Sequence, residues 1–165
     1  MLDRTIILDG FSKSYAMTGW RIGYGIVPEP LVPHIIKLAV NSVSCAASFT
    51  QRAAIAALEG PQETVIDMVE EFRIRRELIV SGLNQIPGIA CPEPGGAFYA
   101  FASIAALGMS SQQFQDRLLN EAGVASVSGR SFGKYGEGFI RLSYANSREN
   151  ILKALDRLEN FVSKQ

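Results

Sequence analysis

The sequence predicts an α/β fold made of two parts, residues 1–60 and residues 61–165. Three observations support this prediction. Short apolar runs near the N-terminus have the length of buried strands. A long helical pattern follows them. Beyond Gly88, strand-like and helix-like segments alternate, as they do in α/β or α+β domains of about 100 residues.

Two strands are expected in the first part, at residues 5–8 and 22–27. Each is a short apolar run closed by turn-forming residues, Asp9-Gly10 after the first and Pro28 after the second. Two strands alone are only marginally stable in water, because a sheet needs further strands or a covering layer. We therefore expect them to belong to a larger sheet whose other members lie outside the chain. An interrupted helical pattern follows over residues 31–57.

One long helix is expected from Pro61 to Ile86, where Pro87-Gly88 stops it. Its apolar positions follow one helix face and are Val65, Met68, Val69, Phe72, Ile79, Leu83 and Ile86. Beyond it, the pattern predicts strands and helices in alternation. The strands are expected at residues 97–101, 124–127 and 139–144, and the helices at residues 110–123 and 147–162. Ser110 and Gln113 have the spacing of a capping box.

The composition is that of an ordinary globular protein. Hydrophobic residues make up 47% of the chain, and sixteen basic side chains balance sixteen acidic ones. This balance gives no attraction to nucleic acid or to an anionic membrane, and no stretch has the roughly 18 apolar residues that a membrane span requires. Cys45 and Cys91 are expected to be reduced, packed thiols. We expect a cytoplasmic protein, without a metal site, that binds small molecules.

A lysine among small and hydroxyl-bearing residues follows the first expected strand. The stretch, residues 11–24, is Phe-Ser-Lys-Ser-Tyr-Ala-Met-Thr-Gly-Trp-Arg-Ile-Gly-Tyr. Ligands of α/β proteins gather beyond strand ends, and a desolvated lysine amine is a nucleophile. Ser12, Ser14 and Arg21 could together hold a phosphate. On spacing alone, an exposed loop lysine beside a surface arginine is the commoner explanation.

The residue order in this stretch resembles the cofactor-lysine signature of class I aminotransferases, which are pyridoxal 5'-phosphate (PLP) enzymes of the aspartate aminotransferase fold. The resemblance implies that Lys13 binds PLP covalently and transfers a proton at the substrate Cα. It implies that Ser12 and Arg21 hold the cofactor phosphate. It also implies the C-terminal part of the type I PLP-dependent transferase fold, with residues 1–60 a remnant of the large domain and residues 61–165 the small domain.

A second candidate site residue, Arg141, lies in the last expected strand. Alternation along this strand puts Ile140 and Leu142 on one face and Arg141 on the other. A strand-borne guanidinium is rigid and can bind a carboxylate through two parallel hydrogen bonds. An ion-paired arginine on an exposed sheet face explains the pattern equally well. The resemblance favours the first explanation, because it implies that Arg141 binds the α-carboxylate of the substrate.

Three further segments bear on the resemblance. Residues 94–99 resemble the strand that borders the substrate pocket, and residues 41–45 resemble a segment that reaches toward the partner subunit in the family's dimers. The loop at residues 126–133 departs from the family's Pro-Gly-x-x-Phe-Gly pattern, because Ser128 stands where proline is usual. This departure puts the rigidity of the loop in doubt.

Family motifs that precede the cofactor lysine have no counterpart in the sequence. One of them, Asp-Glu-x-Tyr, would supply the aspartate that keeps the PLP ring protonated as an electron sink. We therefore expect the chain to be a truncated piece, a proteolytic fragment or a split gene product, with weak PLP binding and little activity alone.

The function expected for the intact enzyme is transfer of an amino group from an amino acid to a 2-oxo acid, by a homodimer that uses PLP. Two alternatives stay open. One is a carbon–sulfur β-lyase of the same fold, which would use the same lysine and arginine. The other is a non-catalytic interaction domain derived from the family. The residues do not identify which amino acid or 2-oxo acid is used.

Overall fold

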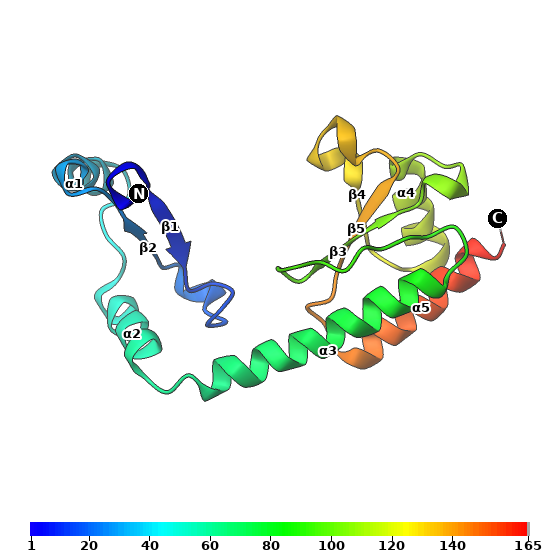
Figure 1. The fold of residues 1–165 in the computed structure, drawn as a ribbon, viewed down its shortest axis with the longest axis horizontal. Helices are drawn as coiled ribbons and strands as arrows, with labels where there is room; N and C mark the ends of the chain where they lie inside the picture. The colour runs from blue at the N-terminus through cyan, green and yellow to red at the C-terminus, as the bar shows by residue number, and fades with distance from the viewer. Residues whose placement is uncertain (165) are drawn as a thin grey trace. The chain divides into compact units, whose positions relative to one another are not determined.

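The computed structural model describes residues 1–164, which fold into two compact units (Figure 1). The first unit comprises Met1–Asp67, and the second begins at Met68. The boundary falls inside the long helix α3 (Glu63–Gln85). Each unit has its own buried cluster and is described by itself.

The first unit contains a two-stranded antiparallel sheet and two helices. Strand β1 (Ile7–Gly10) pairs with β2 (Gly23–Ile26), and α1 (Val32–Ser42) and α2 (Ser48–Glu59) follow. Short 3-10 turns are formed by Leu2–Arg4, Thr18–Trp20 and Glu29–Leu31. The strand expected at residues 5–8 is displaced to residues 7–10, because pairing with β2 sets its ends. The expected break in the helical pattern is confirmed between α1 and α2.

Large apolar side chains of the first unit are unusually exposed. Leu8 is 79% exposed, Leu38 70% and Phe49 70%. An isolated domain rarely leaves so much apolar surface in water, so this exposure agrees with strands and helices that belong to a larger layered structure. The expectation that both cysteines are packed is wrong for Cys45, which is exposed because it lies in the link between α1 and α2; Cys91 is buried.

The second unit contains a three-stranded antiparallel sheet with helices on one face. The strands are β3 (Tyr99–Ser103), β4 (Val127–Ser128) and β5 (Phe139–Ser143), in the order β3-β5-β4. Helices α4 (Ser111–Ala122) and α5 (Arg148–Val162) join α3, and 3-10 turns are formed by Ala105–Leu107, Gly129–Phe132 and Lys134–Gly136. Ile140 and Leu142 of β5 belong to a core that includes Leu83 of α3, Phe114 of α4 and Leu158 of α5.

Local sequence signals locate α4 and α5 closely. The capping box is confirmed, because the Ser110 hydroxyl accepts from the Gln113 N–H at 3.2 Å and the Gln113 side chain accepts from the Ser110 N–H at 3.3 Å. Gly123 ends α4 in the left-handed conformation, with φ of 66°. Ser147 caps α5 through its hydroxyl, which accepts from the Asn150 N–H at 3.2 Å.

Three expectations for the second unit are wrong in part. Residues 124–126 form no strand, because the Val124 N–H still bonds to the Leu118 carbonyl as the end of α4, at 3.3 Å. Strand β3 begins at Tyr99 rather than at Ala97, whose φ of 60° is incompatible with a strand. The apolar face of α3 is buried only in its second half: Val69 is 60% exposed, whereas Leu83 is fully buried.

The loop at residues 126–133 is held by a hydrogen bond at Ser128. The Ser128 N–H donates to Gln115 Oε1 at 2.6 Å, and Ser128 has a φ of −54°. That angle is close to the one that proline imposes. The loop therefore keeps a proline-like backbone at this position, and a donor that proline lacks anchors it to α4.

Ser128 also carries a buried hydroxyl that has no hydrogen-bond partner within residues 1–164. We expect Ser128→Ala to raise the free energy of unfolding by about 1 kcal/mol, because an unsatisfied polar group is removed from the core. Ser128→Pro should be less stable than Ser128→Ala, because Gln115 loses its donor. Urea unfolding of the three proteins measures both differences, and a destabilised Ser128→Ala variant would show that the hydroxyl is satisfied in solution.

Glu71 of α3 links two arginines and should make stability depend on acid pH. It accepts hydrogen bonds from Arg148, at the start of α5, and from Arg75. The hydrogen bond from Arg148, which has the larger effect, and the one from Arg75 lower the pKa of Glu71 to about 2. Since the folded-state pKa is lowered, the stabilisation is present above the ordinary value of 4.5 and is lost as pH falls toward about 2.

We therefore expect Glu71→Gln to lower the thermal unfolding midpoint near neutral pH, with a difference from the wild type that shrinks below pH 4.5. Glu149→Gln is the matched control, since within residues 1–164 Glu149 forms its ion pair with the exposed Lys153 of the same helix, α5. A Glu71→Gln difference that stays constant down to the lowest pH would contradict the linkage.

Candidate functional site

Lys13 lies on a compact loop directly after β1. The Phe11 carbonyl accepts from the N–H groups of Tyr15 and Met17, at 3.3 and 3.2 Å, and the Lys13 carbonyl accepts from the Ala16 N–H at 3.1 Å. Phe11 and Met17 are buried with Ala54 of α2. The two ends of the loop are thus anchored in the core of the first unit, and the side chain of Lys13 between them is exposed.

Arg21 follows on the same connection between β1 and β2. Its backbone is left-handed, with φ of 52°, and its Nη1 donates to the Thr18 carbonyl at 3.2 Å. Non-glycine residues in this conformation are uncommon and often mark functional sites. Ala16 and Ser44 share it, with φ of 52° and 61°. Three left-handed residues in one unit are typical of a functional site rather than of a segment that only packs against a core.

An open cavity of about 630 Å³ lies beside these residues. It is lined by Ala16, Gly19, Trp20, Arg21, Cys45, Ala46, Ala47, Phe49 and Thr50. Arg21 is the only predicted site residue among those lining it, whereas Ser12 and Lys13 lie earlier on the same loop. Its volume falls within the range of small-molecule sites.

Arg141 lies in the middle of β5, with its side chain on the face opposite Ile140 and Leu142, as the alternation predicts. Its guanidinium carbon is 4.2 Å from the ring centroid of Tyr99 and 4.5 Å from that of Phe132. The sequence analysis did not identify these two contacts. Alternation along β3 could have predicted Tyr99 on this face. Phe132 could not be predicted in this way, because it belongs to the 3-10 turn after β4.

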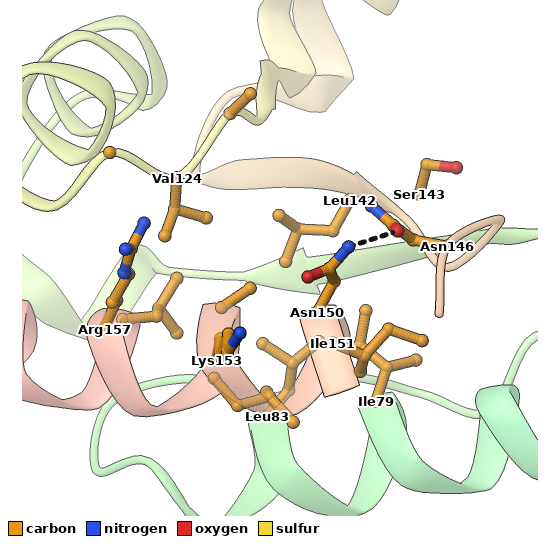
Figure 2. Close-up of a pocket in the computed structure, with 15 residues that line it drawn as sticks. Ile79, Leu83, Val124, Leu142, Ser143, Asn146, Asn150, Ile151, Lys153 and Arg157 are labelled. Carbon is orange, nitrogen blue, oxygen red and sulfur yellow. Dashed lines mark hydrogen bonds between the residues drawn. The ribbon is translucent and has the colours of Figure 1, made fainter. Parts of the chain in front are cut away.

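A separate cavity of about 460 Å³ lies between α3, α5 and β5 (Figure 2). Leu83, Leu142 and Leu158 are among its lining residues, and at its rim Asn150 Nδ2 donates to Asn146 Oδ1 at 2.9 Å. Because neighbouring residues of a strand point to opposite faces, Leu142 lines this cavity and Arg141 does not. The predicted substrate arginine therefore belongs to the other face of the sheet.

Within residues 1–164, none of the helices combines the length and the apolar composition needed to span a membrane.

Comparison with known proteins identifies the family. Residues 2–158 match the family model described as aminotransferase class I and II. An aspartate aminotransferase of Musicola paradisiaca is 44% identical over 165 residues, which cover 99% of this chain and 41% of that protein. The aromatic-amino-acid aminotransferase 2 of Thermococcus litoralis is 39% identical over 167 residues, covering 100% of this chain and 43% of that protein.

Solved structures agree with this result. The crystal structure of an aromatic aminotransferase from Pyrococcus horikoshii matches with a TM-score of 0.95 and 38% identity, over 99% of this chain and 44% of that one. The chain thus spans about two fifths of the length of the relatives it matches, such as 42% of an aspartate aminotransferase structure from Rhizobium meliloti. The expected α/β fold, as part of a larger transferase fold, is confirmed. The chain belongs to the class I and II aminotransferase family.

Proposed function

We propose that this chain carries the cofactor lysine and the substrate arginine of a PLP-dependent aminotransferase, which moves an amino group between an amino acid and a 2-oxo acid. Lys13 binds the cofactor and moves the proton at the substrate Cα. Ser12 and Arg21 hold the cofactor phosphate, and Arg141 binds the substrate carboxylate. In this proposal the intact enzyme is a cytoplasmic homodimer.

The observation that carries the proposal is the family match across residues 2–158, which includes all four residues. The local structure supports it. Lys13 and Arg21 lie on one connection between paired strands. The Lys13 carbonyl accepts from the Ala16 N–H, and the Arg21 side chain donates to the Thr18 carbonyl. Arg141 lies on a central strand, where a side chain is held more rigidly than on a loop.

The residues present fit PLP. A phosphate is bound best by a guanidinium and by backbone or hydroxyl donors, and Arg21 borders a cavity large enough for a small cofactor. When bound, PLP supplies the electron sink for reaction at the substrate Cα. The chain supplies an amine at Lys13 that can accept and return the Cα proton, and a guanidinium at Arg141 that fixes the orientation of the Cα–H bond.

Amino-group transfer is favoured over carbon–sulfur elimination, because the relatives named above are aminotransferases. To test this, the chain is incubated with PLP and a set of amino acids, and formation of pyridoxamine phosphate is followed by mass spectrometry. We expect slow formation that exceeds that of PLP free in buffer. A rate equal to that of free PLP counts against the proposal, and release of a thiol and pyruvate from cystathionine favours the lyase.

A further inference from the structure

Two aromatic rings cover the guanidinium of Arg141. Tyr99 comes from β3 and Phe132 from the 3-10 turn Gly129–Phe132, so the two rings reach Arg141 from different elements. Their centroids lie 4.2 and 4.5 Å from the guanidinium carbon. Both distances are well inside the roughly 6 Å at which a cation and a ring attract each other. We call Tyr99 and Phe132 the aromatic pair.

The Phe132 ring is supported by further rings on the same sheet face. Phe132 contacts Phe101 edge to face, with centroids 6.1 Å apart, and Phe101 stacks on Phe139 at 5.2 Å with an interplanar angle of 10°. Phe132 is 51% exposed. Its place over Arg141 therefore depends on this row of rings and on the turn that carries it, rather than on burial in a core.

The rings take the position that an acidic partner usually occupies. Within residues 1–164, Arg141 forms no ion pair with a carboxylate. Contact with two ring faces restricts the position of the guanidinium without supplying a carboxylate acceptor for its N–H donors, because the attraction is between the positive charge and the rings. Those donors lie in the plane of the group and stay available for a ligand.

We propose that Tyr99 and Phe132 are positioning residues that hold the guanidinium of Arg141 so that it presents an N–H edge to a carboxylate. Both rings lie against the guanidinium, and the ligand binds in the plane of the group through two parallel hydrogen bonds. This inference rests on the proposed role of Arg141 and adds the residues that set its geometry.

The first part of the test needs no ligand. In the ¹⁵N-labelled chain, the Arg141 Nε–H resonance is assigned by its loss in Arg141→Lys. We expect ring currents to separate it from the other arginine resonances. In Phe132→Leu, the chemical shift of the Arg141 resonance should move toward those of the other arginines. In Phe132→Tyr, it should stay unchanged. Tyr135→Leu is the matched control, because this ring is 86% exposed and lies beside Lys134 rather than beside the guanidinium. If the chemical shift of the Arg141 Nε–H resonance changes in neither Phe132→Leu nor Tyr99→Leu, the proposal is wrong.

The second part titrates acetate against the same resonance, with potassium chloride at equal ionic strength as the reference. We expect Phe132→Leu to weaken acetate binding about fivefold and Phe132→Tyr to restore it, with backbone amide spectra unchanged away from the turn. Unchanged binding in Phe132→Leu refutes the positioning role while leaving the proposed function intact. Unchanged binding in Arg141→Lys instead refutes the carboxylate role of Arg141, and with it that part of the proposed function.

Discussion

Replacing Lys13 by alanine is expected to abolish specific covalent capture of PLP by this chain. Borohydride reduction after incubation with PLP should attach one pyridoxyl phosphate group to the wild type, and peptide mapping should locate it on Lys13. The physical reason is proximity. If Arg21 binds the cofactor phosphate as proposed, the amine on the same anchored loop reacts as if PLP were present at high local concentration. Intact-mass spectrometry before and after digestion measures the outcome.

Lys37→Ala is the matched control, because Lys37 lies on α1 of the same unit but outside the loop after β1. It should be labelled as strongly as the wild type. Arg21→Ala should be labelled more slowly, because the phosphate loses its guanidinium partner. If Lys13→Ala takes up as much label as the wild type, the reaction is that of surface lysines in general and the cofactor assignment fails.

Gly136→Ala is expected to cause a large loss of stability and to disturb the turn that carries Phe132. A Cβ added at Gly136 would overlap the carbonyl group of Gly129, and one added at Gly129 would overlap the carbonyl of Gly136. Backbone cannot move aside as a flexible side chain can. We therefore expect a loss of about 3 kcal/mol in the free energy of unfolding, which is the upper end of the usual range for substitutions that add atoms to a packed site.

Gly95→Ala serves as the comparison, since a Cβ added there meets nothing within 4 Å. It should unfold within about 0.5 kcal/mol of the wild type, as most surface substitutions do. Urea unfolding of the three proteins gives these values. A Gly136→Ala variant as stable as Gly95→Ala would mean that the two turns after β4 are not in van der Waals contact in solution.

Local patterns in the sequence predict most elements of the fold, because each depends on neighbours along the chain. Ser110 with Gln113 defines the start of α4, Gly123 defines its end, and alternation along β5 separates Arg141 from Leu142. The elements that were predicted badly depend on distant partners. Of the strand expected at residues 124–127, Val127 alone pairs with β5, together with Ser128 beyond the expected end, and no local pattern determines where such pairing stops.

The candidate site was predicted unevenly for the same reason. Residue order alone proposes Lys13, Ser12, Arg21 and Arg141 as site residues, by resemblance to the family, and these roles stay a prediction. It does not reveal that Phe132 lies over Arg141, because that contact depends on how the turns after β4 fold back on the sheet. Nor does it reveal that the Gln115 side chain anchors the loop by accepting a hydrogen bond from the Ser128 N–H.

The proposed function assigns the cofactor to Lys13 and Arg21 and the substrate carboxylate to Arg141, and calorimetric binding of two ligands tests these assignments directly. N-phosphopyridoxyl-alanine carries both the cofactor and a substrate carboxylate, whereas pyridoxamine phosphate carries the cofactor part alone. We predict that Arg141→Lys weakens binding of the first about tenfold and leaves binding of the second unchanged, while Arg21→Lys weakens both. Equal effects of Arg141→Lys on the two ligands, or no effect on either, would contradict the proposed role of Arg141.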